Sequence, residues 1–166
     1  MQIDTLFITV APGATIKHFT AYDPVAKWTV ASVASVASRA TAHLTSSFLD
    51  KLLAQAPFKI SAIQVDGGAE FMADFEAACR SKNLTLYVLP PKRPQLNGAV
   101  ERCNGSWRYE FYAAYDLPHR VDQLQTLVDA FSHRFNHHRP HDALDGKTPA
   151  EYLSSISSGA PPSHMS

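Results

Sequence analysis

Residues 60–71 read ISAIQVDGGAEF and residues 90–104 read PPKRPQLNGAVERCN, and the stretch bounded by these two motifs decides the fold. Asp66 directly follows an apolar run that is typical of a buried strand. Glu101 lies one turn into a helix that opens after Asn97 and Gly98. Acids at two such positions are hard to explain structurally, so they are candidates for function.

Strands and helices alternate along this part of the chain. We expect a helix over residues 38–55, capped by Ser38 and stopped by Pro57, and a strand over residues 60–65. A helix over 71–82 and a strand over 84–89 follow. This alternation is typical of a parallel sheet with helices on its faces.

The opening residues predict an antiparallel meander. Residues 2–10 are apolar on both faces, which is typical of a central strand, and strands over 16–22 and 28–33 follow it. Asp4 lies in the first of these strands. A carboxylate there is costly unless it is hydrogen-bonded or bound to a cation.

The second half of the chain is mostly helical in pattern. We expect helices over 97–115 and 121–136, a loop over 137–149 and a last turn at 150–153. One domain therefore covers residues 1–153, and residues 154–166 have the composition of a disordered tail. The helix over 97–115 carries an apolar stripe of Val100, Cys103, Trp107 and Phe111 beside a polar stripe of Asn97, Glu101, Asn104 and Arg108.

Composition limits the classes of protein. With 166 residues, 45% of them hydrophobic, the chain can bury one core. It has neither a long apolar run nor a secretory signal, so we expect a soluble intracellular protein. The two cysteines, Cys79 and Cys103, have no metal-binding spacing and predict reduced thiols. A net charge of zero argues weakly against bulk nucleic-acid binding, but residues 92–108 contain four cations and one acid.

Asp4, Asp66 and Glu101 all fall where such sheets bind ligands. Carboxylates brought together repel one another, and divalent cations keep them ionised. Oxygen ligands alone favour a hard ion, magnesium or manganese. Taken singly, Asp66 before two glycines is typical of a turn, and Glu101 is typical of a solvated helix acid.

Four motifs in order resemble one family. They are QIDT at Asp4, VDGGAEF at Asp66, PQLNGAVERCNG at Glu101 and the later FNHHRPHDALDGKTPAEYL. Over residues 3–153 the chain is similar to the catalytic cores of retroviral integrases and bacterial insertion-sequence transposases. These are the DDE recombinases of the rve family, which have an RNase H-like fold.

The resemblance implies an α/β fold with a five-stranded mixed sheet, in strand order 3-2-1-4-5, flanked by helices. It implies that Asp4, Asp66 and Glu101 are catalytic and hold two Mg²⁺ (or Mn²⁺) ions for DNA 3′-end cleavage and strand transfer. Such a polynucleotidyl transferase acts on transposon ends and target DNA, as a homodimer or higher oligomer. The implied location is the bacterial cytoplasm or nucleoid, without a membrane.

The resemblance also suggests DNA contacts around the helix of Glu101. The predicted DNA-binding residues are Lys92, Arg93, Gln95, Asn97, Arg102 and Arg108. The alternative to DNA contact is that these residues belong to a solvated surface loop and to an exposed helix face. For Arg108, a further alternative is an ion pair with Glu101. Asn104, one turn beyond Glu101, is a weaker candidate for supporting the metal ligands.

Two departures and two alternatives remain. Gly67 stands where the family usually has asparagine, and we expect its freedom to adopt positive φ to preserve the turn. We also expect that any upstream DNA-binding segment lies outside this chain. The alternative functions are an RNase H-type nuclease of the same fold, and a non-catalysing DNA-binding or dimerisation module of a transposition complex.

Overall fold

The computed structural model describes residues 1–36, 41–68, 71–90 and 96–158. Five strands form one mixed sheet in the order β3-β2-β1-β4-β5. β1 (Gln2–Ala11), β2 (Ala14–Tyr22) and β3 (Thr29–Ser35) form the predicted antiparallel meander. β4 (Ala62–Val65) and β5 (Thr85–Val88) run parallel to β1, so the predicted strand order is confirmed.

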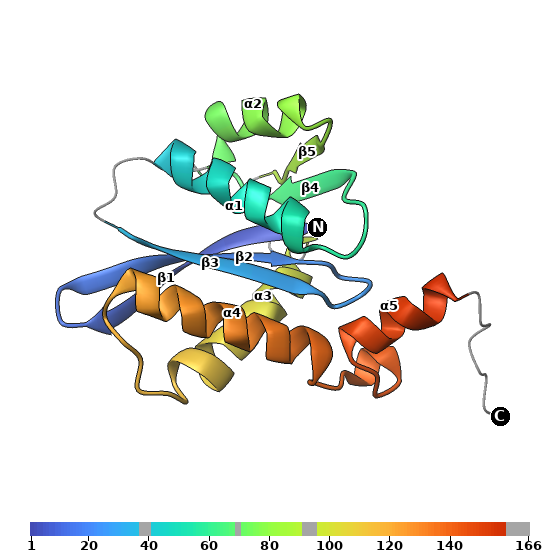
Figure 1. Ribbon diagram of the computed structural model, residues 1–166. Coiled ribbons are helices and arrows are strands. Elements are labelled where there is room, and N and C mark those ends of the chain that lie inside the picture. The colour runs from blue at the N-terminus through green and yellow to red at the C-terminus, as the bar shows by residue number, and fades with distance from the viewer. Residues whose placement is uncertain (37–40, 69–70, 91–95, 159–166) are drawn as a thin grey trace.

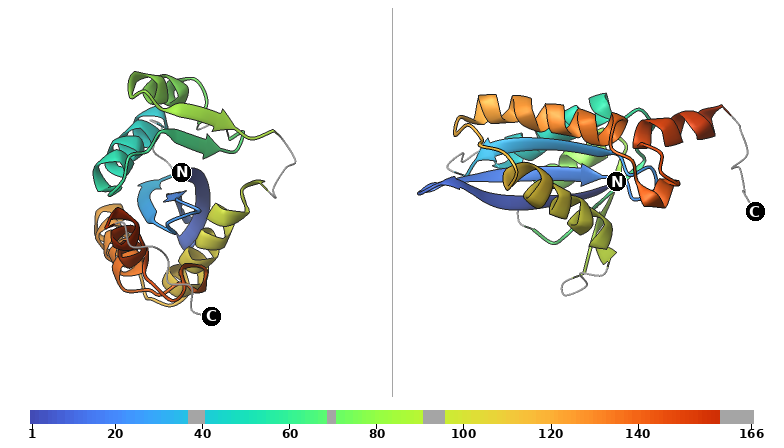
Figure 2. Two further views of the ribbon diagram at one scale, coloured as in Figure 1. Left: turned by 90° about the vertical axis from the view of Figure 1, so that its right-hand side faces the viewer. Right: turned by 90° about the horizontal axis from the view of Figure 1, so that it is seen from below.

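Helices cover both faces of the sheet (Figures 1 and 2). α1 (Thr41–Gln55) and α2 (Asp74–Ser81) pack on one face around Ile3, Phe48 and Phe75. α3 (Gly98–Ser106) and α4 (Val121–His137) pack on the other face. Because side chains alternate along a strand, Asp4 shares the α3 face with Leu6. Among the described residues, no helix is long and apolar enough to cross a membrane.

The helix that carries Glu101 differs from the prediction in its second half. One α-helix was expected over 97–115, but α3 ends at Ser106 and continues as the π-helix η3 (Trp107–Tyr112). In η3 the Trp107 and Phe111 rings both contact Phe131, with centroids 4.7 and 5.2 Å away. The Tyr112 hydroxyl lies 2.7 Å from Nδ1 of His18. These buried contacts favour the wider turn over the regular spacing that the sequence predicted.

The last helix is longer than expected. After the short 3₁₀ turn η4 (Asp142–Leu144), α5 runs over Pro149–Ser157, whereas only residues 150–153 were expected to be helical. Thr148 and Glu151 form a capping box, and Pro149 occupies the first turn. This capped N-terminus stabilises the helix, which continues through residues 154–157, although their serine-rich composition had suggested a disordered tail.

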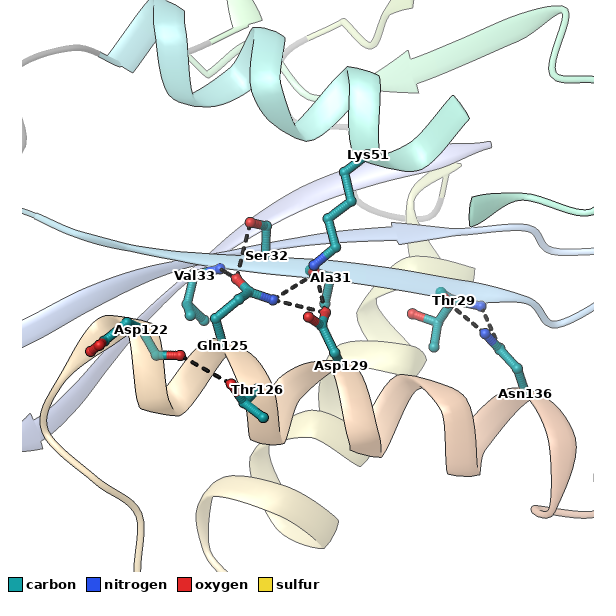
Figure 3. Close-up of polar contacts among 10 residues, drawn as sticks. All are labelled: Thr29, Ala31, Ser32, Val33, Lys51, Asp122, Gln125, Thr126, Asp129 and Asn136. Carbon is teal, nitrogen blue, oxygen red and sulfur yellow. Dashed lines mark hydrogen bonds and ion pairs between the residues drawn. The ribbon is translucent and has the colours of Figure 1, made fainter. Parts of the chain in front are cut away.

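Side chains from the flanking helices occupy the outer edge of β3 (Figure 3). Asn136 accepts a hydrogen bond from Thr29 N (2.9 Å) and donates one to Thr29 O (2.8 Å). Gln125 accepts from Val33 N at 2.8 Å, and Lys51 donates to Ala31 O at 2.8 Å. These bonds satisfy backbone groups that an open edge would offer to another strand.

Candidate active site

Strand pairing places Asp4 and Asp66 on neighbouring strands. In the parallel β1–β4 pair, Ile3 lies opposite Val65. Asp4 follows Ile3 within β1 and Asp66 follows Val65 just beyond β4, so their backbones lie at the same level of the sheet. Asp66 comes immediately after the end of β4, at the carboxyl end where parallel sheets bind ligands.

Two glutamines fix the start of α3 to the same strands. Gln2 accepts a hydrogen bond from Val100 N (3.0 Å) and donates to Leu96 O (3.1 Å). Gln64, which lies opposite Gln2 in the sheet, donates to Leu96 O at 2.9 Å. Because Glu101 directly follows Val100, these hydrogen bonds also hold Glu101 near Asp4 and Asp66.

The sequence analysis missed these two glutamines. Each lies two residues before an aspartate, in QID (2–4) and QVD (64–66), and therefore on the same face of its strand as that acid. The repeated pattern of glutamine, apolar residue and aspartate is the signal that could have revealed them.

Asp4 is a half-buried carboxylate. Its Oδ1 accepts a hydrogen bond from Thr5 N (2.9 Å), and its Oδ2 accepts one from Asn104 Nδ2 (2.7 Å). Burial raises the pKa of Asp4, and the charges of Asp66 and Glu101 raise it further, while the bonds from Thr5 and Asn104 lower it. The charges of Asp66 and Glu101 therefore reach Asp4, and a cation beside Asp4 would relieve that repulsion.

Asp66 and Glu101 are both exposed. Asp66 Oδ1 accepts a hydrogen bond from Gly68 N at 3.1 Å, so the residue also supports its turn. Within the described residues, Glu101 makes no side-chain hydrogen bond or ion pair, and the alternative pairing with Arg108 is not found.

The donor set suits Mg²⁺ or Mn²⁺ in its chemistry, because all three acids offer oxygen ligands. Within the described residues, no group of three acids, histidines or cysteines forms a ready set of metal ligands. Asp4 is tied by two hydrogen bonds, whereas Asp66 and Glu101 are exposed.

The predicted DNA contacts fall in different environments. Lys92, Arg93 and Gln95 lie outside the described residues. Asn97 is buried before α3, and its Oδ1 has no hydrogen-bond partner among the described residues. Arg102 and Arg108 are both exposed on the helix that carries Glu101.

The reason offered for Gly67 is wrong. Among the described glycines, positive φ angles occur at Gly13 and Gly146, and not at Gly67. The turn is held instead by the bond from Gly68 N to Asp66. A Cβ atom added at Gly67 would meet no other atom within 4 Å, so an asparagine would fit there.

The later motif over 135–153 supplies structural contacts. Asn136 holds β3, and Thr148 caps α5. Arg139 pairs with both carboxylate oxygens of Glu110, at 2.7 and 3.0 Å, and lies over the Phe135 ring. Three of the residues that carry the family resemblance therefore stabilise the fold around α3 and α4.

Comparison with known proteins agrees with this architecture. Residues 82–149, which include Glu101, match the family model described as "Integrase core domain". The chain is 26% identical over 111 residues to "Putative integrase ORF3" of Spiroplasma virus SpV1-C74. That alignment covers 59% of this chain and 30% of the viral protein, so the chain spans under a third of that relative.

Two solved structures share the fold. One is the simian T-cell lymphotropic virus intasome in complex with PP2A regulatory subunit B56 gamma, at 20% identity and a TM-score of 0.74. That match covers 99% of this chain and 55% of the other. The second is the catalytic core domain of BIV integrase, at 22% identity and a TM-score of 0.70, covering 96% and 97% of the two chains. Residues 82–149 are thus similar in sequence to an integrase core domain, and nearly the whole chain shares the RNase H-like fold of these two structures.

Proposed function

We propose that the chain is the metal-dependent catalytic core of a DNA transposase or integrase, a polynucleotidyl transferase. The observation that carries the proposal is the position of Asp4, a half-buried acid whose pKa is raised by burial and by the charges of Asp66 and Glu101. A bound cation explains a half-buried acid that feels the charges of two other acids more directly than a structural role does. Relatedness to integrase cores supports the same conclusion.

Asp4, Asp66 and Glu101 would hold two Mg²⁺ ions, which activate an attacking hydroxyl and stabilise the leaving oxygen of an in-line displacement at a phosphodiester. In this scheme Asp4 is the inner, fixed ligand, since two hydrogen bonds orient its carboxylate. Asn104 is a positioning residue that acts through Asp4. Gln2 and Gln64 keep Glu101 at the site by fixing the start of α3.

Transposon ends and target DNA are the proposed substrates. Arg108 and Arg102 would contact phosphates, together with Lys92, Arg93, Gln95 and Asn97. A chain with zero net charge gains little affinity from bulk electrostatics. We therefore propose that it acts as a dimer or higher oligomer, which the similarity to a subunit of a viral intasome supports.

The experiment measures nicking and strand transfer of a DNA duplex with Mg²⁺, alongside a thermal shift with Mg²⁺. Asp66→Asn and Glu101→Gln are compared with Glu76→Gln, an exposed acid on α2. Metal stabilisation of a transition state is worth several kcal/mol, so both site variants should lose about 100-fold or more of activity. Both should also lose the thermal shift that Mg²⁺ gives the wild type, while Glu76→Gln keeps it.

Full activity in Asp66→Asn or Glu101→Gln would refute the assigned roles. An RNA·DNA hybrid is included as a second substrate, because an RNase H-type nuclease would cleave the hybrid in preference to DNA. A wild-type protein that binds Mg²⁺ and DNA but cleaves neither substrate would instead be a non-catalysing assembly module.

A further inference from the structure

A cavity of about 400 Å³ opens beside α3, away from the three acids. We call it the basic cavity and define it by Tyr22, Lys27, Arg102, Arg139, His141 and Asp142. Its walls come from the end of β2, the turn that follows, α3 and the segment after α4. The acid site uses none of these side chains.

Helix geometry separates the two sites. Successive residues turn by about 100° around an α-helix. Arg102 and Ser106, which line the basic cavity, therefore share one side of α3, while Glu101 and Asn104 share nearly the opposite side. An occupant of the basic cavity is thus a different group from the one that reacts at the acids.

Two of the three cations that line the cavity have no acidic partner among the described residues. Arg102 makes no hydrogen bond or ion pair within the described residues, and the Lys27 ammonium donates to the Pro24 carbonyl at 2.6 Å without an acidic partner there. Arg139 is paired with Glu110. Asp142 is the one carboxylate in the described lining. Two uncompensated cations facing one space attract an anion.

The cations converge on shared neighbours. The pKa of His141 is lowered by burial first, and then by Arg139 and Lys27. Burial raises the pKa of the Tyr22 hydroxyl, and Arg102 and Arg139 oppose that rise. Arg139 therefore acts on both side chains, Arg102 acts on Tyr22 and Lys27 acts on His141, as expected for cations that line one cavity.

The backbone at Lys27 is a second, independent sign. Lys27 has φ 60°, a left-handed conformation that is unfavourable for a residue with a Cβ atom. Asp23 imposes the turn by accepting hydrogen bonds from Ala26 N (2.7 Å) and Val25 N (3.2 Å). Glycine would avoid the strain, so a lysine there places a charge at the cavity at some cost. Such strain gathers at binding sites.

We propose that the basic cavity binds a phosphate group. Arginine and lysine around a concave space are the usual recognition set for phosphate, and the volume also admits the sugar attached to it. The phosphate can come from a DNA backbone or from a free phosphate or nucleotide. Only the DNA source rests on the proposed function of the chain.

The test removes the two uncompensated cations. Lys27→Gly deletes the charge and relieves the backbone strain, so it should bind less while unfolding at the same or a higher temperature. Arg102→Ala removes the second cation from an exposed position. Asp142→Asn should bind more tightly, because it removes the opposing carboxylate, and Arg80→Ala on α2 is the control.

Each variant is titrated with inorganic phosphate and with a DNA duplex over a series of salt concentrations. We expect Lys27→Gly/Arg102→Ala to weaken binding about tenfold and, with DNA, to reduce the slope of log K against log salt by about one. A loss with DNA alone identifies a backbone phosphate, and a loss with inorganic phosphate identifies a free phosphate ligand. Unchanged binding of both probes overturns the proposal. The Mg²⁺ thermal shift should persist in these variants, so failure at the acid site is distinguishable.

Discussion

Asn136→Ala should destabilise the protein strongly, although Asn136 is not one of the proposed site residues. Its side chain makes two hydrogen bonds to one residue, at 2.9 and 2.8 Å, and they satisfy both the N–H and the C=O of Thr29. Thr29 is fully buried, and Asn136 is 4% exposed. The alanine variant therefore leaves one donor and one acceptor buried without partners.

Each buried polar group that loses its partner costs about 1–3 kcal/mol, so the pair should cost about 3 kcal/mol or more. In a chain of this size each kcal/mol lowers Tm by about 2–4 °C. The expected decrease for Asn136→Ala is thus about 6–12 °C. Differential scanning calorimetry measures it directly, with Gln123→Ala, an exposed amide on the same helix, as the matched control.

Asn136→Asp sharpens the test because it keeps the shape of the side chain. One carboxylate oxygen can still accept from Thr29 N, but the other faces the Thr29 carbonyl, and two acceptors repel. This variant should be as unstable as Asn136→Ala at pH 7. It should recover relative to the wild type at low pH, where the protonated acid can donate. A Tm within about 2 °C of the wild type for both variants at pH 7 would refute this account of the β3 edge.

Four further predictions follow from the site. In EDTA at pH 7, Asp4→Asn should unfold at a higher temperature than the wild type. Because folding raises the pKa of Asp4, the wild type loses stability as the pH rises from about 3.9 through the folded-state pKa, so the difference in Tm between the two proteins should disappear in acid. Asn104→Ala should weaken Mg²⁺ binding about 10- to 100-fold in a thermal-shift titration, because Asp4 loses its 2.7 Å hydrogen bond. Gly67→Asn should change the free energy of unfolding by less than about 0.5 kcal/mol in urea denaturation, since its Cβ has open space. Binding of the isolated chain to a DNA duplex, followed by fluorescence anisotropy, should be weak and fall steeply with salt, and tight binding at high salt would contradict the zero-charge argument.

Local patterns were sufficient to predict the sheet and the core. The strand that contains Asp4 was identified as central because both of its faces are apolar, and the structure places β1 between β2 and β4. The sequence predicted an apolar stripe of Val100, Cys103, Trp107 and Phe111, and all four residues are buried. These predictions succeeded because a buried strand or helix face repeats apolar residues at a fixed spacing, and that spacing is visible within one segment of the sequence.

Features that depend on a distant partner could not be predicted in the same way. The π-helix at Trp107 follows from ring contacts with Phe131, which lies in another helix, so the local spacing of apolar residues gives no sign of it. Gln2 donates a hydrogen bond to Leu96 O and accepts one from Val100 N, and both partners are nearly a hundred positions away. The pairing of Asn136 with Thr29 is equally remote in sequence. In each case a polar or aromatic residue type was visible, but its partner was not.

The two proposed sites lie on opposite sides of α3, so both sites require that α3 does not rotate about its axis. If α3 turned about its axis by one residue, about 100°, Glu101 would leave the acids and Arg102 would leave the basic cavity. The hydrogen bonds from Gln2 and Gln64 fix its first turn against the sheet. The π-helix fixes its other end, because Trp107 lies between His18 and Phe131 with ring centroids 4.5 and 4.7 Å away. A helix held at both ends by buried contacts can present an acid on one side and a cation on the other without exchanging them.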